Sequence, residues 1–207
     1  ISYKNMFKSR QIFNFDFLFD DISNKYDIFD WESFNDKAKK YEVVATDVIT
    51  GESKFFDKNN CSDIISAVKA SASMPVMSKM IDVEGRKYLD GGISTSIAYK
   101  RAFDVGYSKA IVVHTREEGY RKKPANKINE SIYKRYFKPL PNLVEKLMTV
   151  PERYNKMQEE MEELAKEGKL LIIRPQNKVT VQRLEHSSVK LEKLYNEGYE
   201  VGSKNIE

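Results

Sequence analysis

The segment MIDVEGRKYLDGG, residues 80–92, constrains the fold more than any other stretch of the sequence. Two runs with strand character, MIDV and RKYLD, flank only Glu84 and Gly85, and such a short connection predicts a β-hairpin. The second strand then ends at Asp90, directly before a double glycine. An Asp–Gly pair is by itself a common turn signal, because Asp hydrogen-bonds its own downstream backbone. The sequence therefore predicts a carboxylate at the end of a strand, and its role has to be decided on other grounds.

Helical and strand patterns alternate around this hairpin, which favours an α/β fold. Ser62 and Asp63 are typical helix-capping residues, and the helix they begin ends before Pro75. Gly106 is the expected C-cap of a second helix. The remaining expected elements are a helical segment at 31–40 (WESFNDKAKK), strands at 41–48 (YEVVATDV, buried and central), 53–57 (SKFFD) and 109–115 (KAIVVHT), and the helix at 96–106.

The character of the sequence changes after Arg116, so we place a boundary near residue 117. Residues 1–116 form one domain in this interpretation, and residues 117–207 form a mainly helical C-terminal extension. Pro151 marks an expected helix start and Gly168 its end. This helix carries an apolar stripe formed by Tyr154, Met157, Met161 and Leu164. A strand at 169–175 and a terminal helix follow, with Val189, Leu191, Leu194 and Tyr195 available for packing.

Composition excludes several classes of protein. The 35 Lys and Arg residues against 31 Asp and Glu give a net charge of +4, and the charges are interspersed, so dedicated nucleic-acid binding is not expected. One cysteine cannot form an internal disulfide, and two distant histidines, His114 and His186, do not have metal-ligand spacing. No apolar run is long enough to span a bilayer and no signal peptide is present. We therefore expect a cytoplasmic protein without a metal, with peripheral membrane contact as an open alternative.

Several other residues could carry chemistry, and for each the structural interpretation is favoured. Ser71 and Ser73 lie outside any G-x-S-x-G nucleophile elbow. His114 lies at a strand end and is expected to hydrogen-bond backbone at the rim of the fold. Cys61 is expected to be a small buried filler. The basic loop Arg121–Lys123, with Arg116 nearby, could bind lipid phosphates but is more typical of a solvated loop.

The segment KASASMPVMSKMIDVEGRKYLDGGISTSIAYKRAFDVGYSKAIVVHTREEGY, residues 69–120, closely resembles the C-terminal half of the catalytic domain of bacterial patatin-like phospholipases. The resemblance includes the helix ending in Ala-Ser-x-x-x-Pro, the hairpin, the D-G-G turn and the following helix and strand, in the family's order. The upstream FNFDFLFDDI and the downstream LIIRPQNKVTVQRLEHSSVKLEKLYNEGY are also similar to one bacterial subgroup. The resemblance implies the C-terminal part of a three-layer α/β sandwich with a mostly parallel sheet, plus a mainly helical C-terminal extension.

This resemblance implies acyl-ester hydrolysis by a Ser–Asp dyad, without metal or organic cofactor, in which Asp90 is the general base and Gly91 and Gly92 form the turn that supports it. A serine hydroxyl is a weak nucleophile until a neighbouring base accepts its proton. The family's Gly-rich oxyanion loop and G-x-S-x-G elbow do not occur in residues 1–207. The resemblance places both upstream of Ile1, so the parent protein is expected to be a serine hydrolase of carboxylic esters. The chain alone is expected to be inactive.

A second interpretation keeps the same scaffold without catalysis. In it the chain is a lipid- or protein-binding module that uses the basic loop and the C-terminal helices for its contacts. The expected partners are a lipid or other acyl-ester substrate and either the missing N-terminal segment or a second copy of the chain. An upstream G-x-S-x-G after a strand would distinguish the enzyme from the module.

Overall fold

The computed structural model describes residues 15, 17–182 and 185–206, and the first fourteen residues of the expected domain 1–116 lie outside this description. The described chain divides into two compact units. The first unit comprises residues up to Ile97 together with Ala125–Val150, and the second comprises Ala98–Pro124 together with the residues from Pro151 onward. The boundary near residue 117 stays a prediction.

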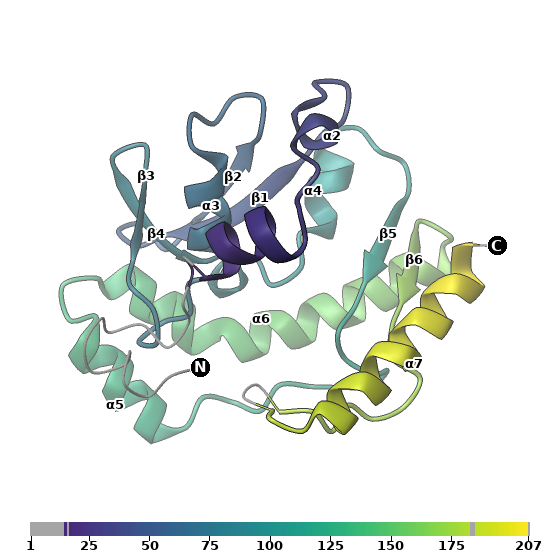
Figure 1. The fold of residues 1–207 in the computed structure, drawn as a ribbon. Helices are drawn as coiled ribbons and strands as arrows, with labels where there is room; N and C mark the ends of the chain where they lie inside the picture. Colours follow the sequence, from purple (N-terminus) through teal and green to yellow (C-terminus); the bar gives the residue numbers. More distant parts are fainter. Residues whose placement is uncertain (1–14, 16, 183–184, 207) are drawn as a thin grey trace. The chain divides into compact units, whose positions relative to one another are not determined.

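The first unit contains a four-stranded sheet in the order β2-β1-β4-β3 (Figure 1). Its strands are β1 (Glu42–Asp47), β2 (Ser53–Asp57), β3 (Ile81–Val83) and β4 (Arg86–Asp90). Each neighbouring pair is antiparallel. This differs from the mostly parallel sheet expected above. The reason is local, because the short β1–β2 and β3–β4 connections join antiparallel neighbours, whereas a parallel pair needs a long crossover.

The predicted hairpin is confirmed. Glu84 and Gly85 connect β3 to β4 with φ angles of 53° and 79°, as a two-residue turn between antiparallel strands requires. The prediction that the strand at 41–48 is central is also confirmed, because β1 has a neighbour on each side. Only its second half, Ala45–Asp47, is fully buried.

Helices cover both faces of this sheet. On one face, α3 (Ile64–Ser71) packs Ala67 and Ala70 into a cluster with Ala45, Phe56 and Tyr88. On the other face, the cluster contains residues of α5 (Lys127–Tyr136), the loop after it and the first half of α6 (Pro141–Lys166). Its buried members are Val48, Leu89, Ile93, Phe137, Leu143, Val144 and Leu147. Adjacent β4 residues thus point to opposite layers, as side chains of a strand do.

Several short elements complete the first unit. They are the π-helix η1 (Phe17–Tyr26), the helix α2 (Trp31–Asn35) and the 3₁₀ turn η2 (Gly91–Ile93). The helical segment expected at 31–40 is therefore half as long as predicted. The predicted start of α3 is confirmed at Asp63, whose carboxylate accepts the Ser66 backbone N–H, whereas Ser62 bonds to Glu84.

The second unit is built around a parallel pair of strands, β5 (Ala110–Val113) and β6 (Leu170–Ile173). It also contains α4 (Tyr99–Asp104), α7 (Ser188–Ile206) and the part of α6 from Pro151 onward. The chain is therefore a mixed α/β protein. Within the described residues, no helix has both the length and the apolar character needed to cross a membrane.

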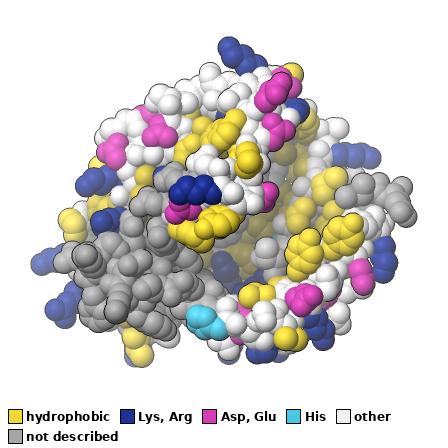
Figure 2. Space-filling view, in the orientation of Figure 1, with side chains coloured by type: hydrophobic (Ala, Val, Ile, Leu, Met, Phe, Trp, Pro, Cys, Tyr) yellow, Lys and Arg dark blue, Asp and Glu magenta, His cyan; other side chains and the backbone are white. Residues whose placement is uncertain are grey.

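One prediction for the C-terminal region is wrong. Pro151 does not begin a helix but lies inside α6, which starts at Pro141. Val189, Leu191 and Tyr195 are exposed on α7, and Figure 2 shows hydrophobic side chains along this helix. The predicted stripe on α6 is buried at Tyr154 and Met161 and half-buried at Met157 and Leu164.

Candidate functional site

Asp90 ends β4, and three hydrogen bonds from different parts of the first unit fix its position. Its backbone N–H donates to the Ser73 carbonyl oxygen at 2.9 Å. The Thr46 hydroxyl donates to the Asp90 carbonyl oxygen at 2.8 Å. One carboxylate oxygen of Asp90 accepts the Gly92 backbone N–H at 2.7 Å. Backbone and side chain are therefore held together, and the carboxylate is pre-organised without being fully enclosed, because Asp90 is half-buried.

A small network of hydroxyl groups stabilises the turn after Asp90. Thr46 is fully buried, and its hydroxyl lies 2.8 Å from the Ser94 hydroxyl. Ser94 also donates its backbone N–H to the Thr46 hydroxyl oxygen at 3.1 Å and its own hydroxyl to the Gly91 carbonyl oxygen at 3.3 Å. The sequence analysis missed both residues. The available signal for Thr46 was a single threonine directly after the apolar run Val43–Ala45.

Gly91 and Gly92 have different reasons to be glycine. Neither has a positive φ, so the turn does not need their conformational freedom. A Cβ on Gly91 would lie 2.2 Å from the Val44 carbonyl oxygen, so only glycine lets this turn pack directly on β1. A Cβ on Gly92 would meet the Asp90 carboxylate at 3.0 Å, which is tight but far less restrictive.

The loop between α3 and β3 lies beside this turn and contains two unusual residues. Val76 has a φ of 67°, a conformation that β-branched residues rarely adopt. The Ser78 hydroxyl is buried and has no hydrogen-bond partner among the described residues. Backbone strain and unsatisfied polar groups are concentrated at functional sites in many proteins. Both features therefore favour this end of the sheet as the candidate functional site.

Neither of the serines considered as nucleophiles has a catalytic environment. Ser73 is fully buried, and its hydroxyl donates to the Lys69 carbonyl oxygen at 2.8 Å. Its backbone carbonyl accepts the Asp90 N–H, so Ser73 supports Asp90 through the main chain alone. Ser71 is half-buried at the last turn of α3.

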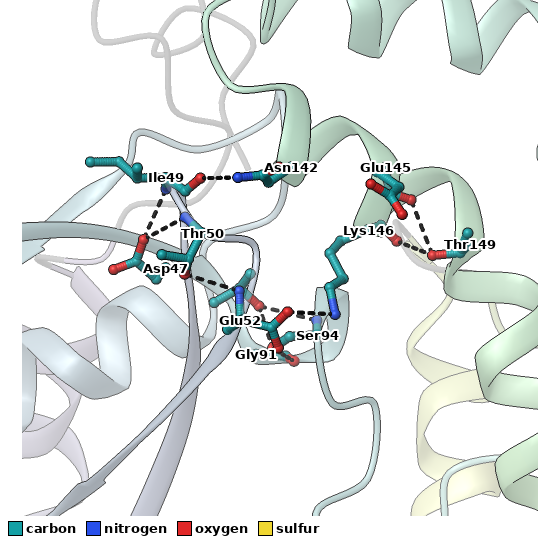
Figure 3. Close-up of polar contacts among 11 residues, drawn as sticks. Asp47, Ile49, Thr50, Glu52, Gly91, Ser94, Asn142, Glu145, Lys146 and Thr149 are labelled. Carbon is teal, nitrogen blue, oxygen red and sulfur yellow. Dashed lines mark hydrogen bonds and ion pairs between the residues drawn. The ribbon is translucent and has the colours of Figure 1, made fainter.

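A second carboxylate, Asp47, ends β1 but has a structural environment (Figure 3). One of its oxygens accepts the backbone N–H groups of Ile49 and Thr50 at 2.9 and 3.0 Å. Its other oxygen lies 2.7 Å from the Arg86 guanidinium. Because these groups occupy both oxygens of a buried side chain, Asp47 organises the β1–β2 turn.

The same turn contacts the start of α6. The Asn142 side-chain amide donates to the Ile49 carbonyl oxygen at 3.0 Å, and Lys146 pairs with Glu52 at 2.9 Å, as Figure 3 shows. These contacts fix the helix against the sheet at the side of the turn.

His114 lies in the second unit and is buried, so its predicted place at the rim is wrong. Its Nδ1 lies 3.0 Å from both the backbone N and the backbone O of Arg116, which agrees with the expected backbone hydrogen bonding. Its Nε2 lies 3.2 Å from the Tyr154 hydroxyl and 2.9 Å from the Gln158 amide nitrogen. Burial lowers the pKa of His114, and the nearby charges of Arg174, Arg116 and Lys122 lower it further, although the hydrogen bond to the Arg116 backbone opposes this. The imidazole is therefore kept neutral and helps to hold β5 to α6.

Cys61 and the basic loop also have structural contacts. Cys61 packs against the α3 cluster, and burial raises the pKa of its thiol, which disfavours the reactive thiolate. The Lys122 ammonium lies 4.2 Å from the centre of the Tyr154 ring, and the Arg116 guanidinium lies 4.9 Å from that of Tyr120. Two of the four basic groups considered for lipid binding therefore lie on aromatic rings.

The surface hollows among the described residues include two of similar size. One, of about 470 Å³, lies along α5 and α6 in the first unit. The other, of about 450 Å³, lies along α7 in the second unit. Asp90 lines neither, so its position at a cleft stays a prediction. Within residues 15, 17–182 and 185–206, no three His, Cys, Asp or Glu side chains gather as metal binding requires.

Comparison with known families gives one match. A family model described as a domain of unknown function, DUF6363, matches residues 140–207. This segment contains α6, β6 and α7 and excludes Asp90. No curated protein matches the chain.

Proposed function

We propose that this chain carries the general base of a patatin-like acyl-ester hydrolase that acts on lipids, and that Asp90 is this base. The observation that supports the proposal most is the state of the Asp90 carboxylate, which is half-buried at a strand end and held by a glycine turn. The neighbouring strand-terminal acid, Asp47, has both oxygens engaged in structural contacts. Of the two acids, only Asp90 lies in the D-G-G motif of the family that the chain resembles, so Asp90 is the better candidate for proton transfer.

In the proposed reaction the serine that attacks the ester comes from a segment preceding residue 1. Asp90 accepts the serine hydroxyl proton while the serine oxygen bonds to the carbonyl carbon, and the proton then passes to the departing alcohol. Water repeats the sequence on the acyl-enzyme and releases the acid. The three hydrogen bonds at Asp90 would keep the carboxylate oriented through both steps.

The proposal extends to the fold. The first unit has helices on both faces of its sheet, which is compatible with a patatin-like three-layer sandwich. In this view the parallel pair β5–β6 belongs to a larger parallel sheet, because such pairs rarely stand alone with an exposed apolar face. Ile111 and Val113 of β5 expose their side chains on that face.

The first testable prediction concerns turnover of p-nitrophenyl esters. The 207-residue chain should be inactive, the chain joined to its natural upstream segment should be active, and Asp90→Asn in the longer chain should abolish activity. Asn keeps the size of Asp but cannot accept the hydroxyl proton, and loss of one member of a cooperating catalytic set costs on the order of 10⁴ in rate.

Asp104→Asn is the matched control, because Asp104 is an exposed acid at the end of α4. It should leave turnover unchanged. Activity of the longer chain that survives Asp90→Asn would overturn the assignment of the base. A longer chain that is folded and inactive, and that lacks a G-x-S-x-G after a strand, would favour the binding module instead.

A further inference from the structure

Helix α5 has two apolar faces, and only one of them packs against other residues that the structure describes. Tyr133 and Phe137 face the apolar cluster between the sheet and α6, which contains Leu89 and in which Phe137 is only 1% exposed. Ile128, Ile132 and Tyr136, spaced four residues apart, form a second stripe on the same helix. Their side chains are 70%, 43% and 51% exposed.

Most of this stripe is exposed, although the Tyr136 ring contacts the buried Phe137 edge-on at 4.9 Å between ring centres. A surface helix normally presents one apolar face to the core and polar residues to solvent. Here two isoleucines and a tyrosine occupy solvent-exposed positions at which polar residues would be compatible with the helix. An exposed apolar row of this kind is typical of an interaction surface.

The charges around the stripe indicate the kind of partner. Four exposed basic residues lie on α5 or just beyond its end: Lys127, Lys134, Arg135 and Lys138. The one acid of the helix, Glu130, pairs with Lys134 at 2.6 Å. The local surface is therefore positive.

The exposed apolar residues of α7 form a useful contrast. Tyr195 and Tyr199 are more exposed than Tyr136, but α7 has as many glutamates as lysines, namely Glu192, Glu197 and Glu200 against Lys190, Lys193 and Lys204. Of these two exposed stripes, the one on α5 therefore has the charge that complements an anionic surface.

We propose that α5 docks the protein on anionic membranes, lying in the plane of the interface with Ile128, Ile132 and Tyr136 inserted among the lipids. A helix with aliphatic and aromatic residues on one face and lysines and arginines beside them binds a bilayer surface in this way. The tyrosine places an apolar ring and a polar hydroxyl at the level of the headgroups. The basic side chains add electrostatic attraction to anionic lipids. This surface is separate from Asp90 and does not depend on the proposed hydrolysis.

Co-sedimentation with vesicles tests the proposal. The chain should bind vesicles of equimolar phosphatidylcholine and phosphatidylserine and should bind phosphatidylcholine vesicles much more weakly. Ile128→Ser with Ile132→Ser should lower the partition coefficient by about tenfold or more, because each isoleucine loses its insertion into the apolar layer. Arg135→Gln with Lys138→Gln should also weaken binding, by about fivefold for each charge removed. Added salt should weaken binding by the wild-type chain.

Val189→Ser with Tyr195→Ser on α7 is the matched control, because Val189 is 74% exposed. It should leave vesicle binding unchanged. Binding that is equal on both kinds of vesicle, or that survives the double isoleucine substitution, would overturn the proposal. So would a wild-type dimer in sedimentation velocity that the isoleucine substitutions dissociate, without vesicle binding, because a second copy would then be the partner of the stripe.

Discussion

Single residues at the end of the sheet divide into those that build the turn and Asp90, the proposed general base. Thr46, Ser73 and Gly91 are fully or nearly fully buried, and each fixes the main chain around Asp90. The position of Asp90 at the strand end was predictable, because turn chemistry is local. Its partners were not, because Thr46 lies 44 residues away in the sequence and only the folded sheet brings it close.

Gly91→Ala should destabilise the protein by roughly 1–3 kcal/mol or more. The added methyl group would lie 2.2 Å from the Val44 carbonyl oxygen, so either β1 or the turn has to move. The measurement is urea unfolding. Gly92→Ala is the comparison, because its methyl group would meet only the Asp90 carboxylate, and it should lower stability less. Equal stability of both variants and the wild type would contradict the close packing at Gly91.

The free energy of unfolding should depend on pH below the ordinary pKa of His114. The pKa of His114 is lowered from 6.5 in the folded protein, mainly by burial. The unfolded chain therefore takes up the proton first, so the contribution of His114 to stability is present above about pH 6.5 and falls as the pH drops below it. Urea midpoints across this range are the measurement. His114→Gln, which cannot titrate, should show a weaker fall, and an identical pH dependence would contradict the buried neutral imidazole.

Secondary-structure elements were predictable where their signals are short-range. The hairpin at Glu84 and Gly85, the cap at Asp63 and strand β1 each depend on neighbouring residues. Pro151 was misleading. Proline favours a first helical turn, yet α6 continues through it, with Leu143 and Leu147 buried before it and Tyr154 and Met161 buried after it. Packing on both sides of the proline therefore outweighs its local preference.

Met161→Asp should destabilise the protein by roughly 2–5 kcal/mol, because the Met161 side chain is only 1% exposed and a carboxylate there would be buried. Thermal unfolding is the measurement. Val189→Asp introduces the same carboxylate at an exposed position on α7 and should change the melting temperature little. If Met161→Asp melted like the wild type, the stripe on α6 would not contribute to the core.

At the scale of the whole molecule, the two compact units are interleaved along the chain. The first unit takes residues from both sides of the segment Ala98–Pro124, which belongs to the second. A change in composition near residue 117 could not reveal this arrangement, because composition reports on neighbouring residues and not on which distant segments pack together. The DUF6363 match likewise begins at residue 140, inside the first unit.

The apolar cluster between the sheet and α6 cannot form until late in synthesis on the ribosome. Val48 and Leu89 are buried by Leu143 and Leu147, which are far downstream. At about 5–20 residues per second, Leu143 is added roughly 5–20 s after Val48. Until then this apolar face of the nascent sheet has no cover from α6. The growing chain should therefore be a client for chaperones that bind extended apolar segments, for as long as translation takes to reach α6.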